Sequence, residues 1–581
     1  MTEGRRDDPA PRPGQEPGPD PAQESEQAGV LGSSAVMAAG TIVSRLSGYV
    51  RSILLALALG NLLHADVFNL ANTVPNMLYI LLAGGVFNAV LVPQLVRAMR
   101  HDPDGGEAYT NRIVTAAGLF LAAVTVLLVL AAPWVMSLYL DGKWSEPSRA
   151  AQRESVIDFA RYCLPQVFFY GMFVLVGQVL NARGRFGPMM WAPIANNVIS
   201  VAVLLVYLFW FGPAEGAERF GGYDSSQELV LGLGSTLGIV AQFLILVPYL
   251  RAAGFRYRPR FDFRGTGLGH TLRLGTWTVL FVIVNQIAYT VVVRLASSGT
   301  AGGGEDGTGY SVYSAAFLIV MVPHSVITVS LTTAILPRLS ARAADGDLSG
   351  LGRSLTSTLR TALAVVVPFA ALLPLIASDL AKVIWGYGAA AATYENYVPS
   401  LALFGPGLVL FTVHYLMLRG FYAVERTRTV FWIQCGVAAT NIVMAMALVL
   451  RADDAGTSPA LVLAYTASYA VGAVASYLVL QRALGSLDTA VLVRFGVRLA
   501  LAVLVSTAVA WAALQALDGP LGGLLDAEGG VWPWVMAGVR AALVALVDVV
   551  VFLVCARLLH LREVTRVLDL VLRRRPPAHR R

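Results

Sequence analysis

The chain has 581 residues, of which 56% are hydrophobic and only 14% charged, and its mean hydropathy is +0.64. A soluble protein of this length needs far more polar surface, so this composition excludes a soluble protein. The formal charge of +7 does not indicate a nucleic-acid partner, because the cations gather in short connections between apolar runs. We expect a polytopic membrane protein.

Residues 1–32 are rich in Pro, Gly and acidic residues and contain no apolar run. Such a composition cannot bury enough apolar surface to fold, and it lacks the apolar core of a secretory signal peptide. The segment is predicted to be a disordered cytoplasmic tail.

Apolar runs of about 20 residues, each long enough to cross a hydrocarbon core of roughly 30 Å, then recur almost to the end of the chain. The fourteen predicted spans lie near 34–60, 67–96, 111–138, 156–181, 187–211, 229–250, 268–297, 310–337, 356–379, 396–421, 429–450, 459–481, 491–517 and 532–559. The predicted fold class is therefore all-α.

Arginines are distributed unevenly among the connections between these spans. Even-numbered connections carry many, such as Arg97 and Arg100, whereas odd-numbered connections carry acids, such as Asp453 and Asp454. Cytoplasmic loops of membrane proteins are enriched in Lys and Arg. We therefore predict that the even connections and both termini are cytoplasmic, including a basic linker at 251–267 and a basic tail at 561–581.

An internal repeat is visible in four pairs of landmarks at a near-constant offset of 241–248 residues. The pairs are Pro75 with Pro323, Pro93 with Pro337, Trp191 with Trp432, and Asn197 with Asn441. They predict a duplicated six-helix unit, with an N-lobe over 33–250 and a C-lobe over 268–482. Because six is even, both copies face the same way, and parallel repeats of this kind place a substrate path between the lobes. Spans 13 and 14, within 491–560, are an addition.

The first span, GTIVSRLSGYVRSILLALALG, carries two arginines. At about 100° per residue, Ser44, Arg45 and Arg51 share one polar face with Thr41, Gly48 and Ser52. An arginine near the bilayer centre costs about 2.5–3.5 kcal/mol on insertion scales, so this face should meet protein or water. Snorkelling to the cytoplasmic headgroups is the alternative for Arg45. Arg51 lies deeper, and snorkelling suits it less.

The second span carries a similar polar stripe. Asp66, Asn69, Thr73 and Asn76 recur at steps of three and four residues, with Asn72 beside them, and Asp66 is expected at the outer entrance. Intramembrane Asn commonly forms helix–helix hydrogen bonds, which is the alternative for each residue singly. Next to an arginine-bearing stripe, the whole set favours a polar cavity.

Weaker cavity candidates lie in spans 7 and 8. They are Asn285, Gln286, Arg294 and His324. A lone histidine is more often a hydrogen-bonded packing residue than a proton relay, and Arg294 lies near the outer end of its span. Asp548 in span 14 is a buried acid for which the sequence offers no partner.

No pattern in the chain indicates catalysis. Nucleotide-binding, kinase and zinc-protease motifs are missing, and the three cysteines are too widely spaced for a metal site. We therefore predict a transporter without cofactor or metal. A cavity with fixed positive charge and amides suits phosphate or pyrophosphate, because the planar fork of Arg offers paired donors. In a bilayer, the corresponding ligand is a lipid whose head group carries phosphates and sugars.

Several segments resemble the MurJ/MviN family of lipid II flippases, within the multidrug/oligosaccharidyl-lipid/polysaccharide exporter superfamily. They are VSRLSGYVRSILLALALG, ADVFNLANTVPNMLYILLAGGVFNAVLVPQL, VLNARGRFGPMMWAPIANN, ITVSLTTAILPRLS and RGFYAVERTRT. The resemblance covers about 33–570 and implies two six-helix lobes around a cationic cavity, with spans 13 and 14 forming a groove for the undecaprenyl tail. Arg45, Arg51 and Asp66 fall on charged positions of the family.

This resemblance implies that the chain moves lipid II, a peptidoglycan precursor, across the bacterial cytoplasmic membrane by alternating access, in peptidoglycan biosynthesis, cell-wall biogenesis and the maintenance of cell shape. Membrane lipids and the cell-wall synthesis machinery are the other expected partners.

Four positions depart from the family pattern. Many members carry a basic residue where this chain has Tyr79, an acid where it has Gly84, and an Asp-Arg pair where it has Phe317 and Leu318. Two of three usual cavity arginines are therefore missing. Another polyprenyl-linked glycan is the alternative substrate. A multidrug exporter of the same superfamily, an integral glycosyltransferase and a scaffold for wall synthesis are less favoured.

Overall fold

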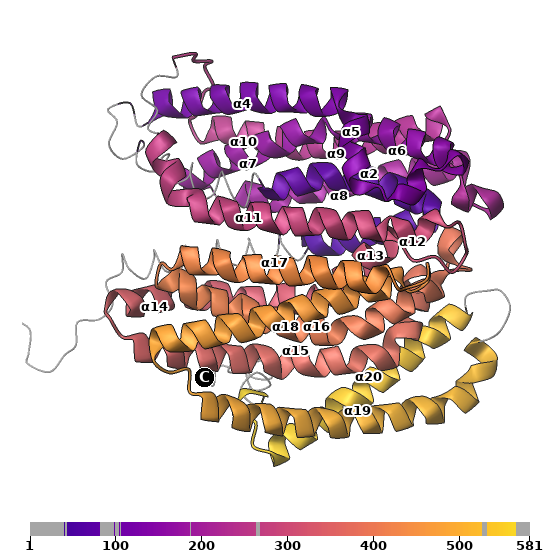
Figure 1. Ribbon diagram of the computed structural model, residues 1–581, viewed down its shortest axis with the longest axis vertical. Coiled ribbons are helices and arrows are strands. Elements are labelled where there is room, and N and C mark those ends of the chain that lie inside the picture. Colours follow the sequence, from indigo (N-terminus) through magenta and orange to yellow (C-terminus); the bar gives the residue numbers. More distant parts are fainter. Residues whose placement is uncertain are drawn as a thin grey trace, which may run out of the picture.

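The computed structural model of the chain describes residues 40, 43–81, 98, 104, 106–185, 187–262, 268–525 and 532–564, and for 268–275 and 521–525 the backbone alone. Throughout these ranges the chain forms helices joined by turns, and no strand occurs among them (Figure 1). The predicted all-α class is confirmed. The predicted tail at 1–32, Thr41, Gly84 and most of the tail at 561–581 lie outside the described residues.

The first half of the chain forms a helix over 43–59, followed by a series of helices that covers predicted spans 2 to 6. These are α2 (Leu63–Ile80), α4 (Glu107–Leu130), α5 (Ala132–Tyr139), α6 (Ala150–Cys163), α7 (Gln166–Ala182), α8 (Gly187–Phe211), α9 (Ser225–Leu244) and α10 (Leu246–Ala252). Predicted spans 3, 4 and 6 are each built from two consecutive helices.

The second half begins at α11 and contains the longest helices. Its members are α11 (Leu268–Ala296), α12 (Ser298–Ala301), α13 (Tyr310–Val320), α14 (Val329–Ala344), α15 (Leu348–Trp385), α16 (Val398–Ala423), α17 (Thr427–Val449), α18 (Thr457–Leu484), α19 (Thr489–Leu525) and α20 (Trp532–Leu558). A π-helical turn over His324–Thr328 separates α13 from α14, and the two helices are bent by 46° at this break.

Each of the fourteen predicted spans contains a helix. By length and composition, 11 of the described helices could cross a membrane, or 12 if the bent α13–α14 pair is one span. The helices over 43–59 and α2 occupy the two remaining predicted spans. The chain is thus polytopic, and the count of fourteen stays a prediction.

Large apolar side chains cover the outside of the helices. Phe209, Trp134 and Leu130 are 85%, 82% and 76% exposed. Soluble proteins rarely expose apolar surface so extensively, whereas helices that face lipid do so without cost. The apolar exterior therefore agrees with a membrane environment.

The helices gather into two groups (Figure 1). In the first, α8 packs on α9, α2 on α6 and α4 on α7; in the second, α16 and α17 pack on α18, α15 on α16, and α11 on α17. Helices α19 and α20 pack on each other and on α15. We call these the first group, the second group and the added pair; the residue bounds of the predicted lobes stay predictions.

One end of the bundle carries the odd-numbered connections, which the arginine bias predicts to face outward; we call it the outer end. A large buried cluster joins the two groups here, and it includes Trp144, Trp385 and Tyr397. The Trp385 and Tyr397 rings stack at 3.8 Å between centroids, and Trp144 Nε1 donates to the Ser297 carbonyl at 2.8 Å. Apolar burial therefore closes the two groups together at this end.

Part of the predicted basic linker is fixed to α4. Arg112 donates to Asp262 at 2.5 Å, and the backbone N–H of Arg258 donates to Asn111 Oδ1 at 2.8 Å. The hydrogen bond from the Arg112 guanidinium lowers the pKa of Asp262. Through residue 262, then, the linker lies along the first group.

An ion-pair network attaches the added pair to α15. Arg540 of α20 donates to Asp379 of α15 at 2.6 Å and to Asp518 of α19 at 2.5 Å. Asp379 is only 2% exposed, so its carboxylate depends on this partner. Deeper in the same pair, Asp548 is only 1% exposed, and its Oδ1 has no hydrogen-bond partner within the described part of the chain.

Arg540→Leu is expected to lower the thermal unfolding midpoint of the detergent-solubilised protein clearly. Removing one partner of a buried ion pair leaves the other charge uncompensated, which costs about 3–5 kcal/mol. Arg451→Leu is the control, because Arg451 is also at the outer end but is exposed, and within the described residues it is bonded only to a backbone carbonyl. Equal midpoints for the two variants would show that Arg540 does not hold the added pair.

Candidate functional site

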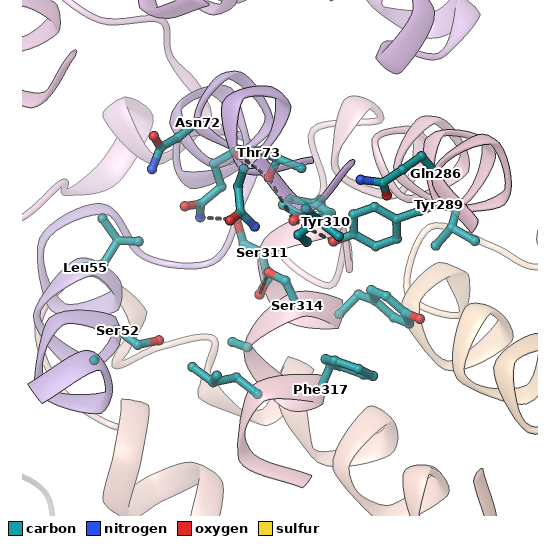
Figure 2. A pocket seen from close by; sticks show the side chains of 18 of the residues that line it. Ser52, Leu55, Asn72, Thr73, Gln286, Tyr289, Tyr310, Ser311, Ser314 and Phe317 are labelled. Atoms are coloured by element: carbon teal, nitrogen blue, oxygen red, sulfur yellow. Dashed lines mark hydrogen bonds between the residues drawn. The ribbon is translucent and has the colours of Figure 1, made fainter. Parts of the chain in front are cut away.

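A cavity of about 680 Å³ lies between the two groups of helices. The helix over 43–59, α2, α7, α8 and α9 line it from one side, and α11, α13, α17 and α18 from the other. Its volume is typical of sites that enclose a small organic molecule. Figure 2 shows polar side chains from α2, α11 and α13 gathered on its wall.

The wall is polar but almost without charge. Carboxamides form the largest polar class: Asn69, Asn72, Asn76, Gln166, Asn196, Asn197, Asn285, Gln286, Gln434 and Asn441. Tyrosines add hydroxyl groups and ring faces: Tyr170, Tyr289, Tyr310, Tyr313, Tyr397, Tyr465 and Tyr469. Among the described lining residues, Arg51 is the one charged side chain, and no acid is present. The cavity therefore offers donors and a positive charge.

The stripe on α2 faces this cavity and contacts the second group. Asn69 Nδ2 donates to Ser311 Oγ at 2.8 Å, and Thr73 Oγ1 donates to the Tyr310 hydroxyl at 2.8 Å. The Tyr310 hydroxyl lies 2.9 Å from that of Tyr289 (Figure 2). The stripe therefore has both of the predicted roles. Its residues line the cavity, and they also form hydrogen bonds between helices.

Arg51 lies on the wall without a protein counter-charge. It is half-buried, and no ion pair or hydrogen bond to it is found within the described part of the chain. An arginine inside a membrane is energetically costly unless water, protein or a ligand solvates it. Its guanidinium is therefore available to an anionic ligand.

The structure brings seven of the predicted site residues onto the cavity wall and places five elsewhere. The seven are Arg51, Asn69, Asn72, Thr73, Asn76, Asn285 and Gln286. The five away from the wall are Ser44, Arg45, Asp66, Arg294 and His324.

Two of these five lie on the first helix. Arg45 is exposed, as expected of an arginine nearer the headgroups. The Ser44 carbonyl accepts a hydrogen bond from Asn197 Nδ2 at 2.9 Å, so this residue helps to join the helix to α8.

The other three are used in packing or at the outer end. His324 is buried, with Nδ1 3.1 Å from Thr412 Oγ1, as is common for a single intramembrane histidine. Arg294 donates to the Ser137 carbonyl at 2.7 Å. Asp66 is 0% exposed, and its placement corrects the expectation that it faces the cavity.

Asp66 caps a helix of the other group. Its Oδ1 accepts from the Ser311 N–H at 2.7 Å, and its Oδ2 accepts from the Tyr310 N–H at 3.1 Å and from Thr300 Oγ1 at 2.6 Å. Tyr310 begins α13, whose own preceding residue, Gly309, has no side chain to cap it. An acid at a helix N-terminus satisfies free N–H groups and complements the helix dipole.

A second contact closes the outer end in the same way. Asn61 Nδ2 donates to the Thr393 carbonyl at 2.7 Å, and Thr393 Oγ1 donates to Asn61 Oδ1 at 2.6 Å. Both residues are buried. Together with the Asp66 cap, this pair joins the two groups at the outer end of the molecule.

The residues that the sequence analysis did not select are mostly amides and tyrosines of the second group and of α7. Gln166 Nε2 donates to Asn72 Oδ1 at 3.1 Å, and Gln434 Nε2 donates to Asn285 Oδ1 at 2.6 Å. Both are isolated glutamines in apolar runs, so the polarity criterion applied to α2 could have found them. Tyrosine carries no such signal, since it is common in membrane helices as a packing residue.

Comparison with known proteins gives a consistent picture. The family model described as "Lipid II flippase MurJ" matches residues 55–519. The "Probable lipid II flippase MurJ" of Haemophilus influenzae is 26% identical over 406 residues, covering 67% of this chain and 75% of that protein. The "Lipid II flippase MurJ" of Burkholderia cenocepacia is 26% identical over 403 residues, covering 68% and 74%.

Solved structures show the same fold. The structure titled "Lipid II flippase MurJ, inward closed conformation" has a TM-score of 0.67 at 16% identity, covering 89% of this chain and 98% of that one. An inward-facing multidrug resistance MATE family transporter has a TM-score of 0.57 at 16% identity, covering 75% and 94%. At sequence identities this low, these structural matches support the fold alone.

Proposed function

Since this chain belongs to the lipid II flippase MurJ family, we propose that it moves lipid II from the inner to the outer leaflet of the bacterial cytoplasmic membrane. Members of this family are transporters and not enzymes. The observation that carries the proposal for this chain is the cavity between its two groups, with Arg51 as an unpaired cation among amides and tyrosines.

The chemistry of the wall suits a pyrophosphate-linked sugar. Arg51 presents paired donors to phosphate oxygens, and the carboxamides both donate to and accept from sugar hydroxyls. Tyrosine rings provide flat apolar surface for sugar faces, with a hydroxyl at the edge. The polar head would thus be sheltered in the cavity while the polyprenyl tail stays in lipid, where each buried CH₂ is worth about 0.8 kcal/mol.

Transport then requires the two groups to open and close alternately around the head group. The buried contacts at the outer end support an assignment of this conformation to the state that is closed outward. The orientation with both termini in the cytoplasm, inferred from the arginine bias, gives the head group access from the cytoplasmic side.

Another polyprenyl-linked glycan is the second candidate substrate. Phe317 and Leu318 line the cavity as apolar side chains, at positions where the family resemblance leads one to expect an Asp-Arg pair. Export of cationic drugs is less favoured, because the described wall offers no acid to pair with a cation.

The decisive experiment is a leaflet-accessibility assay in cells depleted of their own lipid II flippase. Expression of this chain is expected to restore access of an outside probe to labelled lipid II and to restore growth. If lipid II stays inaccessible while the protein is abundant in the membrane, the proposed substrate is wrong. The same assay with a different labelled polyprenyl-linked glycan then tests the second candidate.

A further inference from the structure

A second, smaller cavity of about 290 Å³ lies inside the second group of helices; we call it the side chamber. It is lined by α11, α16, α17 and α18. Asn285, Gln434 and Tyr469 line both the side chamber and the main cavity. The two spaces therefore share a wall, which the hydrogen-bonded Asn285–Gln434 pair forms in part.

The side chamber contains one charged group, the guanidinium of Arg419. Arg419 lies near the end of the predicted span at 396–421, and the structure places it within α16. Its guanidinium carbon is 4.3 Å from the ring centroid of Tyr415 and 5.6 Å from that of Tyr422. Aromatic rings thus hold the cation in the chamber and do not let it extend into a loop.

The guanidinium has no protein counter-charge in the described part of the chain. No acid there forms an ion pair with Arg419, and its buried Nε has no hydrogen-bond partner. By contrast, Arg540 of α20 has two acids as partners. A buried N–H without an acceptor is destabilising, so an anion that reaches the guanidinium would stabilise this arrangement.

The ring contacts leave the useful donors free. A cation–π contact uses the face of the guanidinium and compensates part of its charge. The N–H groups lie in the plane, where they can bind a carboxylate or phosphate through two parallel hydrogen bonds. Arg419 can therefore bind such a group through paired N–H donors.

We propose that the side chamber binds a carboxylate of the transported head group, with Arg419 as its bidentate partner. This inference rests on the proposed function, because the head of lipid II carries a peptide with carboxylates in addition to sugars and pyrophosphate. The walls favour an organic acid over a bare inorganic anion, since Phe281, Phe411 and Tyr415 are aromatic.

Two separate cations would then bind the two ends of one ligand. Arg51 in the main cavity takes the phosphates, and Arg419 in the side chamber takes the peptide carboxylate. This division accounts for a cavity that has Phe317 and Leu318 where the family resemblance predicts a charged pair.

The test measures binding of two lipids to the purified protein in detergent: lipid II, and the same lipid carrying its disaccharide and pyrophosphate but no peptide. Arg419→Gln is expected to weaken lipid II binding at least tenfold and to leave binding of the peptide-free lipid unchanged. Arg419→Lys, which keeps the charge without the planar fork, should recover part of the loss. Arg426→Gln is the matched control, because Arg426 is exposed just beyond α16 and should affect neither lipid.

Three results would overturn the inference. Equal weakening of both lipids by Arg419→Gln would assign this arginine to the phosphates or to packing. Unchanged lipid II binding, with acetate binding to the wild type but not to the variant, would make the chamber a site for free anions. If the wild type binds neither lipid, the proposed function fails first and the inference fails with it.

Discussion

Arg51→Gln is expected to abolish lipid II transport while the protein still reaches the membrane at normal abundance. Arg51 is the one charged side chain on the described wall of the cavity, so no neighbour can replace its positive charge. Loss of one partner from a desolvated, hydrogen-bonded charge pair costs about 2–5 kcal/mol, and often more. At about 1.4 kcal/mol per tenfold, this is a loss of roughly 30-fold or more in affinity for the phosphates. The measurement is leaflet accessibility of labelled lipid II in depleted cells.

Two variants separate charge from geometry and position. Arg51→Lys keeps the charge but loses the planar fork, so it should retain partial transport. Arg45→Gln changes an arginine on the same helix that is exposed and away from the wall, so it should cost less than Arg51→Gln. Normal transport by the Arg51→Gln protein would contradict a role for this cavity in binding phosphates.

Much of this architecture could be predicted because a membrane imposes strong constraints on sequence. A span needs about 20 apolar residues, and every backbone group must be paired within the helix or barrel. The same constraint made the α2 stripe visible: Asn69, Asn72, Thr73 and Asn76 stand out against an apolar background, and all four line the cavity.

The errors arise where one sequence pattern serves two purposes. A polar residue in a span can line a cavity, connect two helices or cap a helix end, and periodicity does not distinguish these roles. Asp66 follows the same spacing as Asn69 and Thr73, yet it is fully buried against α13. Its partners, Thr300, Tyr310 and Ser311, lie more than 230 residues away in the chain, so only the tertiary fold brings them together.

Arg419 was missed for a related reason. Close to the end of a predicted span, an arginine usually reaches the headgroups and is counted toward topology. Its position between Tyr415 and Tyr422 follows from the i, i+4 and i, i+3 spacing on α16, which is visible in the sequence. The cavity beside it depends on how α11 and α17 pack, and this packing cannot be seen in the sequence.

Asp66→Asn is expected to open the outer end of the molecule. The carboxylate accepts three hydrogen bonds from the second group, and it complements the N-terminus of α13. An asparagine of the same size presents an NH₂ group to at least one N–H donor and carries no charge. Hydrogen bonds to charged groups contribute about 1.5–3 kcal/mol each, so loss of even one would shift the closed-to-open equilibrium roughly 10-fold to 150-fold.

The shift can be measured as a distance between spin labels at positions 215 and 395, in a background without the three native cysteines. Both positions are exposed, and they lie at the outer end of the first and second groups. The wild type should show a single short distance, and Asp66→Asn should add a longer one. Gly309→Ala provides a second route, because a Cβ there would lie 1.8 Å from Asp66 Oδ2 and would separate the cap without removing its charge. Asp224→Asn is the control, since Asp224 caps α9 within the first group and should leave the distance unchanged. An unaltered distance in both Asp66→Asn and Gly309→Ala would show that the cap does not hold the outer end closed.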